Sequence, residues 1–307
     1  MYYKNNILIL LLEKNKNLFY LVGKSLKYLS KKRKKNFIIV GQKNFFDKKF
    51  QGLLYKVDNL KNKKIRNKVA IIDIASSSKK NYFNKTMNFA IQSLKNKQAE
   101  GFINLPINKK ILPKKFVGFT EFFSSKLNTS GKETMLMFNP NFSVSPITTH
   151  VEVNRIRRFL TKKKIVNNVK NIKKFYRKYV RIDINILITG LNPHAGIDMK
   201  KTNEERKIII PAIKELKKKY AKVSGPYSAD SVYNHGLKLK KPFCIVGMYH
   251  DQILPVFKSI NKFDGINITI GSRFLRASPD HGTADNIVDL KDIHNMSFKK
   301  CINFFSL

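Results

Sequence analysis

Short apolar runs alternate with segments of helical spacing along most of the chain, and this alternation limits the possible folds more than any other feature. Runs typical of buried strands cover residues 7–12, 36–41, 69–74, 101–105, 184–189 and 243–246. Helical spacing covers 18–30, 84–94, 162–179 and 204–220, with Asn84 and Thr161 as expected N-caps. Strands that alternate with helices favour a largely parallel sheet covered by helices. At 307 residues, we expect one large α/β unit or two lobes.

Three of the six histidines lie where a predicted strand gives way to a loop. His150 follows the weaker apolar run 144–149, His194 follows 184–189 and His250 follows 243–246. Ligands of open α/β sheets bind just beyond the carboxyl ends of strands, and neutral imidazole is the commonest metal ligand in proteins. Each histidine alone could be a surface or capping residue. The repeated setting, in a chain poor in histidine, favours a metal site that leaves one position open for substrate.

The formal net charge is extreme, at 61 − 20 = +41. Such a charge can indicate a partner with a polyanionic surface, such as nucleic acid. However, Lys far outnumbers Arg, Asn, Ile and Phe are abundant, Trp is absent, and the lysines are spread along the chain. We therefore favour compositional drift of an AT-rich coding sequence, and expect non-specific polyanion binding at low salt but no specific nucleic-acid partner.

The two cysteines cannot form a disulfide framework, so a reducing cytoplasm is the expected compartment. The longest early apolar run, 7–12, is far shorter than the ~20 residues that span a bilayer. It is also shorter than the ~7–15 residues of a signal-peptide core, so we expect no membrane partner. Neither a G-x-G-x-x-G fingerprint nor a P-loop is present, so any dinucleotide would bind without a Rossmann motif.

Eight polar segments, in order and with close to the family spacing, resemble those of the 4-hydroxythreonine-4-phosphate dehydrogenase family. Any one of them is weak, but together they cover roughly residues 100–290 and are highly specific. They are 105–109 (LPINK), 118–122 (GFTEF), 148–150 (TTH), 190–196 (GLNPHAG), 225–230 (GPYSAD), 249–252 (YHDQ), 265–271 (GINITIG) and 276–284 (RASPDHGTA).

The resemblance implies the two-lobed α/β/α fold of the isocitrate and isopropylmalate dehydrogenases, with a central, mostly parallel, non-Rossmann sheet. We expect residues 1–118 with 262–307 to form the first lobe, on the cofactor side. Residues 119–261 would form the second lobe, with the metal, substrate and dimer contacts. The family works as a homodimer in which each cleft uses groups from both chains.

The resemblance also implies roles for individual residues. One divalent ion (Zn, Mg or Co) would be held by three histidines, and NAD or NADP by the loop that begins at Asp280. A phosphorylated amino acid suits cationic partners such as Lys258 and Arg276. The implied residues are His150, His194 and His250 for the metal, Thr120, Lys258, Asn267 and Arg276 for the substrate, Asp230, Asp251 and Lys258 for catalysis, and His281, Gly282, Thr283 and Ala284 for the cofactor. In so basic a chain Lys258 could instead be a solvated lysine, Asp230 a turn or helix cap, and Asn267 an exposed strand residue.

The implied reaction is oxidation and decarboxylation of 4-phosphooxy-L-threonine to 3-amino-2-oxopropyl phosphate, in pyridoxal phosphate biosynthesis. Two alternatives stay open. The substrate could be another phosphorylated hydroxy acid of the 4-phospho-threonate or erythronate type. The chain could also be a drifted, inactive relative that binds polyanions.

Three departures from the family pattern bear on this expectation. The glycine-rich loop of the family after the first strand is replaced by residues 13–22, which contain no glycine or proline. Phe119 stands where the family usually has His, which removes a polar substrate contact. Asn286 stands at an acidic position of the cofactor loop, so NAD affinity and the choice between NAD and NADP are open.

Overall fold

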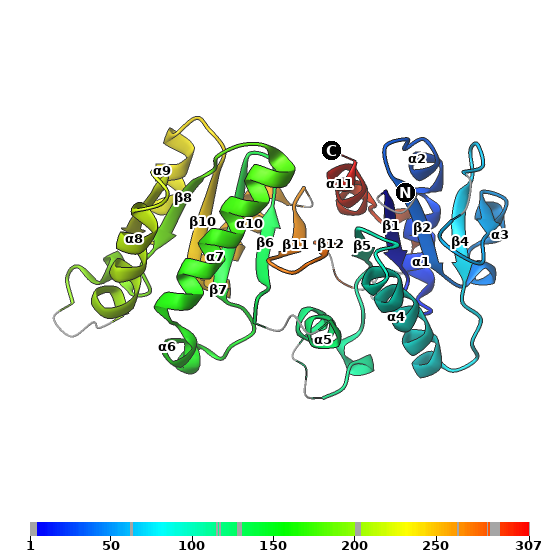
Figure 1. Ribbon diagram of the computed structural model, residues 1–307, viewed down its shortest axis with the longest axis horizontal. Coiled ribbons are helices and arrows are strands. Elements are labelled where there is room, and N and C mark those ends of the chain that lie inside the picture. The colour runs from blue at the N-terminus through cyan, green and yellow to red at the C-terminus, as the bar shows by residue number, and fades with distance from the viewer. Residues whose placement is uncertain are drawn as a thin grey trace. The chain divides into compact units, whose positions relative to one another are not determined.

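The computed structural model describes residues 5–61, 64–114, 116, 118–127, 131–199, 204–262, 264–280, 282 and 289–306. The chain divides into two compact units (Figure 1): unit 1 is Met1–Ser130 with Arg273–Leu307, and unit 2 is Gly131–Ser272. The unit boundaries fall after residues 130 and 272 instead of the predicted 118 and 261. The first boundary is later because Phe119, Phe122 and Phe123 belong to the core of unit 1. The second is later because the strand at 266–270 pairs with the one at 134–138.

The described residues of unit 1 form six strands that pair in parallel throughout. The strand order is β3-β4-β2-β1-β5-β12. Every residue of the central β1 is buried, as expected of a parallel strand covered on both faces. The strands are β1 Asn6–Leu10, β2 Asn36–Gly41, β3 Leu54–Lys56, β4 Val69–Asp73, β5 Gly101–Asn104 and β12 Leu275–Pro279.

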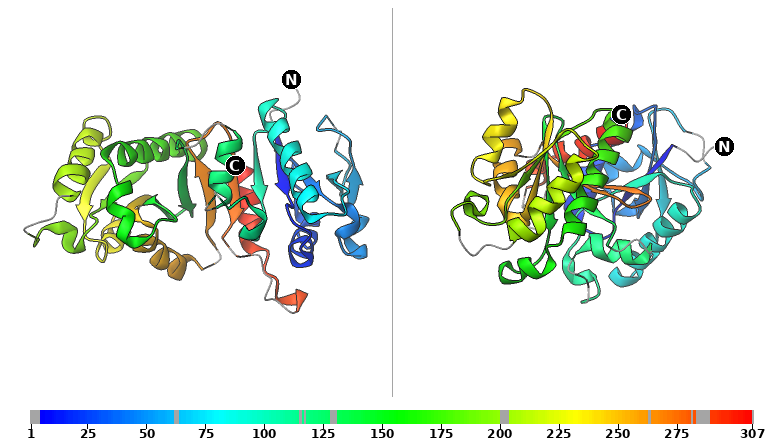
Figure 2. Two further views of the ribbon diagram at one scale, coloured as in Figure 1. Left: turned by 90° about the horizontal axis from the view of Figure 1, so that it is seen from below. Right: turned by 60° about the vertical axis from the view of Figure 1, so that its left-hand side comes forward.

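Helices cover both faces of the unit 1 sheet (Figure 2). Leu8 and Leu10 point into a core shared with α4 and α5. On the other face, α11 lies beside the α1–α2 segment, where Asn295 Nδ2 donates to Ser25 Oγ at 2.9 Å. The helices are α1 Lys16–Gly23, α2 Leu26–Ser30, α3 Lys48–Gln51, α4 Lys79–Lys95, α5 Phe119–Lys126 and α11 Met296–Phe305.

Unit 2 has a mixed, mostly parallel sheet in the order β11-β6-β7-β10-β8-β9. The four strands from β7 to β9 are parallel neighbours, whereas β6 runs antiparallel to both β7 and β11. The predicted α/β class with a mostly parallel sheet is therefore confirmed. The strands are β6 Thr134–Phe138, β7 Phe142–Thr148, β8 Asn185–Thr189, β9 Val223–Tyr227, β10 Phe243–Tyr249 and β11 Ile266–Ile270.

Alternating residues of the unit 2 strands also meet helices on both faces. Val144 and Ile245 pack in a core with residues of α9 and α10, while Ser143 bonds the Tyr176 hydroxyl, just after α7, at 2.6 Å. The helices are α6 Ile156–Phe159, α7 Lys162–Phe175, α8 Ile210–Lys217, α9 Val232–Lys238 and α10 His250–Asn261. No helix in the described ranges has the length and apolar character needed to cross a bilayer.

The element predictions hold better for strands than for helix ends. Thr161 caps α7 as predicted, because its hydroxyl accepts from the Lys164 N–H at 3.2 Å. The predicted cap at Asn84 is wrong: α4 begins earlier, where Ser78 Oγ accepts from the Asn81 N–H at 3.2 Å. The helix predicted over 18–30 is divided into α1 and α2, because the chain turns at residues 24–25.

Replacing Leu8 by Ala should destabilise unit 1, because Leu8 is 0% exposed at the centre of the parallel sheet. The expected loss of unfolding free energy is about 2–5 kcal/mol, from lost burial and a residual cavity. Urea unfolding followed by circular dichroism measures it. Leu237→Ala is the control: that side chain is 55% exposed and should change stability by less than about 0.5 kcal/mol. Equal urea midpoints for the two variants would contradict the packing of Leu8 in the core of unit 1.

Candidate active site

The carboxyl ends of four neighbouring parallel strands of unit 2 carry titratable side chains. Thr148 at the end of β7 pairs with Tyr249 at the end of β10, so the residues that follow them lie close together. His150 and His250 accordingly have ring centroids 5.7 Å apart, with 35° between their planes. Two of the three predicted metal ligands therefore lie side by side.

His194 follows β8 in a tight turn with an unusual backbone. His194 and Ala195 have φ of 50° and 53°, in the left-handed region that L residues rarely adopt. Each such residue costs about 1–3 kcal/mol and persists only where the surroundings enforce it. Gly190 makes room for the turn, because a Cβ there would lie 2.5 Å from Ala195 Cα.

The buried Glu205 and the half-buried Gln252 hold this turn in place. Glu205, which is 2% exposed, accepts from the backbone N–H groups of Leu191 and Asn192 through Oε1, both at 2.9 Å. Gln252 accepts from the Met248 N–H at 2.7 Å and donates to the Gly190 carbonyl at 2.8 Å, and so connects the ends of β10 and β8. Neither Glu205 nor Gln252 was predicted from the sequence to have a role. The scarcity of acidic residues in the chain was the one signal that could have drawn attention to Glu205.

Carboxylates engage the Nδ1 atoms of two of the three histidines. His194 Nδ1 lies 2.7 Å from Asp198 Oδ2, and His250 Nδ1 lies 2.5 Å from Asp251 Oδ1. The hydrogen bond to Asp198, with the charges of Asp198 and Asp230, raises the pKa of His194 above its ordinary 6.5. A hydrogen bond to Ser228 lowers the pKa of Asp230, which therefore stays ionised at neutral pH. With Nδ1 engaged, Nε2 is the nitrogen that each ring can offer to a metal, a common arrangement at metal sites.

The predicted metal residues are thus grouped only in part. The structure places His150 beside His250, and His194 beside Asp198. Within the described residues, no three His, Cys, Asp or Glu side chains are grouped closely enough to hold a metal ion. A site formed by all three histidines therefore stays a prediction.

In unit 1, two of the predicted substrate residues are in direct contact. Arg276 on β12 is only 7% exposed, and its Nη1 donates to Thr120 Oγ1 at 2.9 Å. Its Nε donates to Asn104 Oδ1 at 2.7 Å. Burial lowers the pKa of Arg276 to about 10, so the guanidinium remains a cation at neutral pH. These contacts fix the guanidinium at the end of β5.

Phe119 contributes to the same cluster. The Arg276 guanidinium lies 5.2 Å from the centroid of the Phe119 ring, which stacks on Phe123 at 5.8 Å. Cation–π contacts of this kind stabilise a cation where water is excluded. The departure at position 119 therefore supplies an aromatic wall for Arg276.

The other two predicted substrate residues belong to unit 2. Lys258 lies in the last turn of α10, about 12 Å along the helix axis from His250. Asn267 lies on β11, and its Oδ1 atom is buried without a hydrogen-bond partner among the described residues. A buried acceptor left unsatisfied costs about 1–3 kcal/mol, which a donor on a ligand would relieve. Of the predicted cofactor loop, Gly282 is exposed, whereas His281, Thr283 and Ala284 lie outside the described residues.

The segment that replaces the glycine-rich loop lines a cavity of about 640 Å³ in unit 1. Asn15 caps α1 by accepting from the N–H of Asn17 at 2.9 Å, and Glu13 accepts from the Asn108 N–H at 2.9 Å. The loop is thus rebuilt without glycine. The lining favours an anionic ligand, because it has four lysines and one carboxylate: Glu13, Lys14, Asn15, Lys16, Asn17, Lys79, Asn108, Lys110 and Ile111.

Comparison with known proteins gives consistent results. The family model described as "Pyridoxal phosphate biosynthetic protein PdxA" matches residues 32–305. The 4-hydroxythreonine-4-phosphate dehydrogenase of Wigglesworthia glossinidia brevipalpis is 36% identical over 72% of this chain and 68% of its own length. That of a Sulfurihydrogenibium species is 31% identical over 85% of this chain and 86% of its own.

A solved structure shares the fold. The 4-hydroxythreonine-4-phosphate dehydrogenase of Klebsiella pneumoniae superimposes with a TM-score of 0.79 at 20% identity, over 98% of this chain and 99% of that one. The expected fold is therefore confirmed, and the dehydrogenase relatives identify an oxidoreductase. Because the family model matches most of its length, the chain belongs to the PdxA family of pyridoxal phosphate biosynthetic proteins.

Proposed function

We propose that the chain catalyses metal- and NAD-dependent oxidation of 4-phosphooxy-L-threonine, followed by loss of CO2, to give 3-amino-2-oxopropyl phosphate. The observation that carries the proposal is the set of imidazoles and carboxylates that follow neighbouring parallel strands of unit 2. The relatives named 4-hydroxythreonine-4-phosphate dehydrogenase support the choice of substrate.

The residues that would hold a divalent metal are His150, His194 and His250. A bound metal would polarise the hydroxyl that is oxidised and lower its pKa. Asp198 and Asp251 would orient two of the rings through Nδ1, so that Nε2 faces the ion. Asp230, which is ionised at neutral pH, would accept the hydroxyl proton at a carboxylate oxygen, and Asp251 would help relay it.

Four residues are proposed as substrate contacts. Arg276 would bind an anionic substrate group through its guanidinium, with Thr120 beside it. Lys258 would supply a second cation, at the phosphate or as a proton source. Asn267 would accept a hydrogen bond from the substrate at its unsatisfied Oδ1.

The proposed cofactor is NAD, or NADP, bound by the loop of His281, Gly282, Thr283 and Ala284. The lysine-lined cavity of unit 1 supports a phosphate-bearing ligand of this kind. We further propose a cytoplasmic homodimer in which each active site uses groups from both chains.

Metal analysis after dialysis tests the ligand set. Wild type should retain one ion per chain, and His194→Ala should lose it together with NADH production, since removing one ligand of three weakens the site severely. His235→Ala is the matched control. Because His235 packs on Tyr227, the variant without it should keep the ion. A His194→Ala protein that retains wild-type metal content would refute the three-histidine site.

The pH response of His194 gives a second test. Its imidazolium should titrate above 6.5 in the metal-free protein, because Asp198 stabilises the charged ring. Asp198→Asn should lower that midpoint, and should therefore let a metal compete with the proton at lower pH. Proton NMR of the ring resonances measures both midpoints. Coincident midpoints in wild type and variant would show that Asp198 does not act on His194.

A second candidate function is oxidation of another phosphorylated hydroxy acid. The contact between Phe119 and Arg276 supports it, because an aromatic ring stands there in place of a polar substrate contact. If Phe119 shapes selectivity, Phe119→His should shift the ratio of kcat/KM between 4-phosphooxy-L-threonine and 4-phospho-threonate by about tenfold. A substrate panel on both proteins decides the matter. Unchanged ratios would remove position 119 from the specificity argument.

A further inference from the structure

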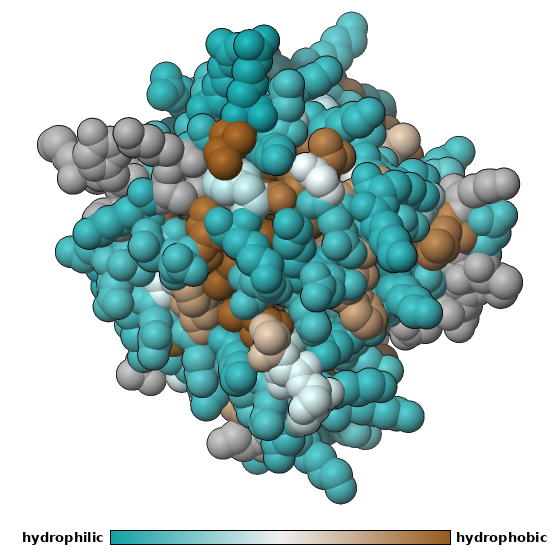
Figure 3. All heavy atoms as spheres, turned by 90° about the vertical axis from the view of Figure 1, so that its right-hand side faces the viewer, coloured by the Kyte–Doolittle hydropathy of each residue, from teal (hydrophilic) through white to brown (hydrophobic). Residues whose placement is uncertain are grey.

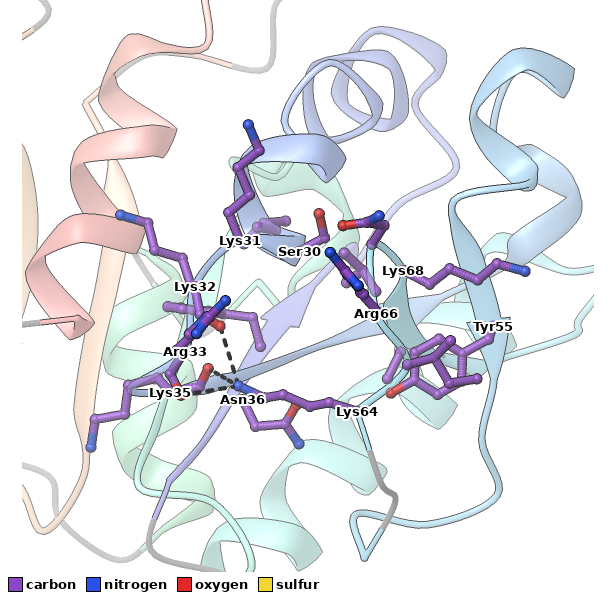
Figure 4. A pocket seen from close by; sticks show the side chains of 16 residues that line it. Ser30, Lys31, Lys32, Arg33, Lys35, Asn36, Tyr55, Lys64, Arg66 and Lys68 are labelled. Atoms are coloured by element: carbon purple, nitrogen blue, oxygen red, sulfur yellow. Dashed lines mark hydrogen bonds between the residues drawn. The ribbon is translucent and has the colours of Figure 1, made fainter.

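Unit 1 contains a second concave site, at the amino ends of β2 and β4. This cavity of about 370 Å³ is lined by the end of α2, the loop into β2, Tyr55 and residues 64–70 (Figure 4). An adjoining hollow of about 260 Å³ shares Arg33, Lys35, Asn36 and Lys64 with it. The larger cavity alone falls within the usual size of small-molecule sites, about 300–1,000 Å³. The proposed substrate and cofactor contacts of unit 1 involve other residues.

Among the residues that the structure describes, the lining of this cavity is basic and contains no acidic side chain. Its seven cationic residues are Lys31, Lys32, Arg33, Lys35, Lys64, Arg66 and Lys68. Some of them are engaged elsewhere: Lys35 pairs with Glu100, and Lys32 donates to Asn303 Oδ1 at 2.8 Å. In Figure 4 the ammonium groups of Lys31, Lys35 and Lys68 point away from the hollow. The cationic groups that face the cavity are therefore not explained by the overall excess of lysine.

Two arginines face the hollow from opposite sides. Figure 4 shows Arg33 on one wall and Arg66 on the other, with the open space between them. Among the described residues, neither guanidinium makes a hydrogen bond or an ion pair. Arg is scarce here, with ten residues among the 61 cations. A planar guanidinium donates two parallel hydrogen bonds to a phosphate, which a lysine cannot do.

Lys64 holds the two walls together. Its ammonium donates to the carbonyls of Lys32, Arg33 and Lys35 at 3.2, 3.4 and 2.7 Å. Burial lowers the pKa of Lys64. The segment that carries Arg66 is thereby fixed to the one that carries Arg33 before any ligand arrives. Such preorganisation reduces the entropy lost on binding.

We propose that this cavity, which we call the amino-end pocket, binds a ligand that carries a chain of two or three phosphates. Two guanidinium groups facing one another suit consecutive phosphates, and the Tyr55 ring supplies an aromatic wall beside them. The chemistry is shared by nucleoside polyphosphates and inorganic polyphosphate.

An extended nucleic acid fits these observations less well. Its affinity would come from many lysines spread over the surface, so that any two cations would contribute about equally. The face of unit 1 in Figure 3 is hydrophilic over most of its area, with hydrophobic side chains in small patches. The amino-end pocket differs from that surface because its arginines converge on one hollow.

Isothermal titration calorimetry of the full-length chain at about 150 mM KCl tests the proposal. The probes are sodium triphosphate, ATP and a single-stranded RNA. Arg33→Gln/Arg66→Gln should raise the Kd for triphosphate at least about tenfold, because both bidentate partners are lost. Tighter binding of ATP than of triphosphate would assign the ligand as a nucleotide, and equal binding would assign it as the phosphate chain alone.

Two controls separate this site from general charge and from the proposed active site. Arg158→Gln/Arg181→Gln removes the same two charges in unit 2 and should change the Kd less than about twofold. Arg276→Gln should leave triphosphate binding intact, while the Arg33/Arg66 variant should retain dehydrogenase activity. Equal losses in both double variants, binding of RNA alone, or loss of triphosphate binding in Arg276→Gln would each overturn the proposal.

Discussion

The parallel register of β7, β10, β8 and β9 is the constraint on which the candidate metal site depends. It brings the loops after four strands to one edge of the sheet, although those loops are far apart in the sequence. Register alone leaves the loop after β8 free to take many conformations. Glu205 and Gln252 remove that freedom by accepting from, and donating to, the backbone at the strand ends. The cost of two left-handed residues at His194 and Ala195 is thus offset by these half-buried hydrogen bonds.

In unit 1 the comparable constraint is the burial of a cation. Arg276 is only 7% exposed, so its guanidinium needs acceptors from the protein, and side chains of β5, α5 and β12 provide them. The aromatic face of Phe119 stabilises the positive charge of Arg276, which water would otherwise solvate. A polar residue at position 119 would change the hydration of Arg276 as well as any direct contact with substrate. Phe119 would therefore affect substrate binding indirectly, through the environment of Arg276.

The sequence predicted the strands well, because parallel strands buried on both faces appear as continuous apolar runs, such as Phe37 to Val40. It missed β3 and β6, although β6 is apolar over Met135–Phe138. It also missed β9 and β12, whose residues include Ser224 and Arg276, since these two strands carry too few apolar side chains to produce a signal. The adjacency of His150 and His250 followed from strand ends alone. The hydrogen bonds from Glu205 and Gln252 to the turn after β8 could not be predicted, because they depend on a loop conformation that only tertiary contacts enforce. The contact between Phe119 and Arg276 likewise joins residues that the sequence keeps far apart.

The few carboxylates of this basic chain are unevenly distributed between the two candidate sites. The chain has 20 acidic residues against 61 basic ones, so a cluster of acids is not expected at any one place. Yet Asp198, Glu205, Asp230 and Asp251 all follow or support the carboxyl-end loops of unit 2, where a divalent cation would have to be attracted. The amino-end pocket of unit 1 has the opposite character, with two arginines and no acidic side chain in the described part of its lining. Drift toward lysine raises the charge everywhere and does not by itself predict this contrast, which fits the opposite charges of the ligands proposed for the two sites.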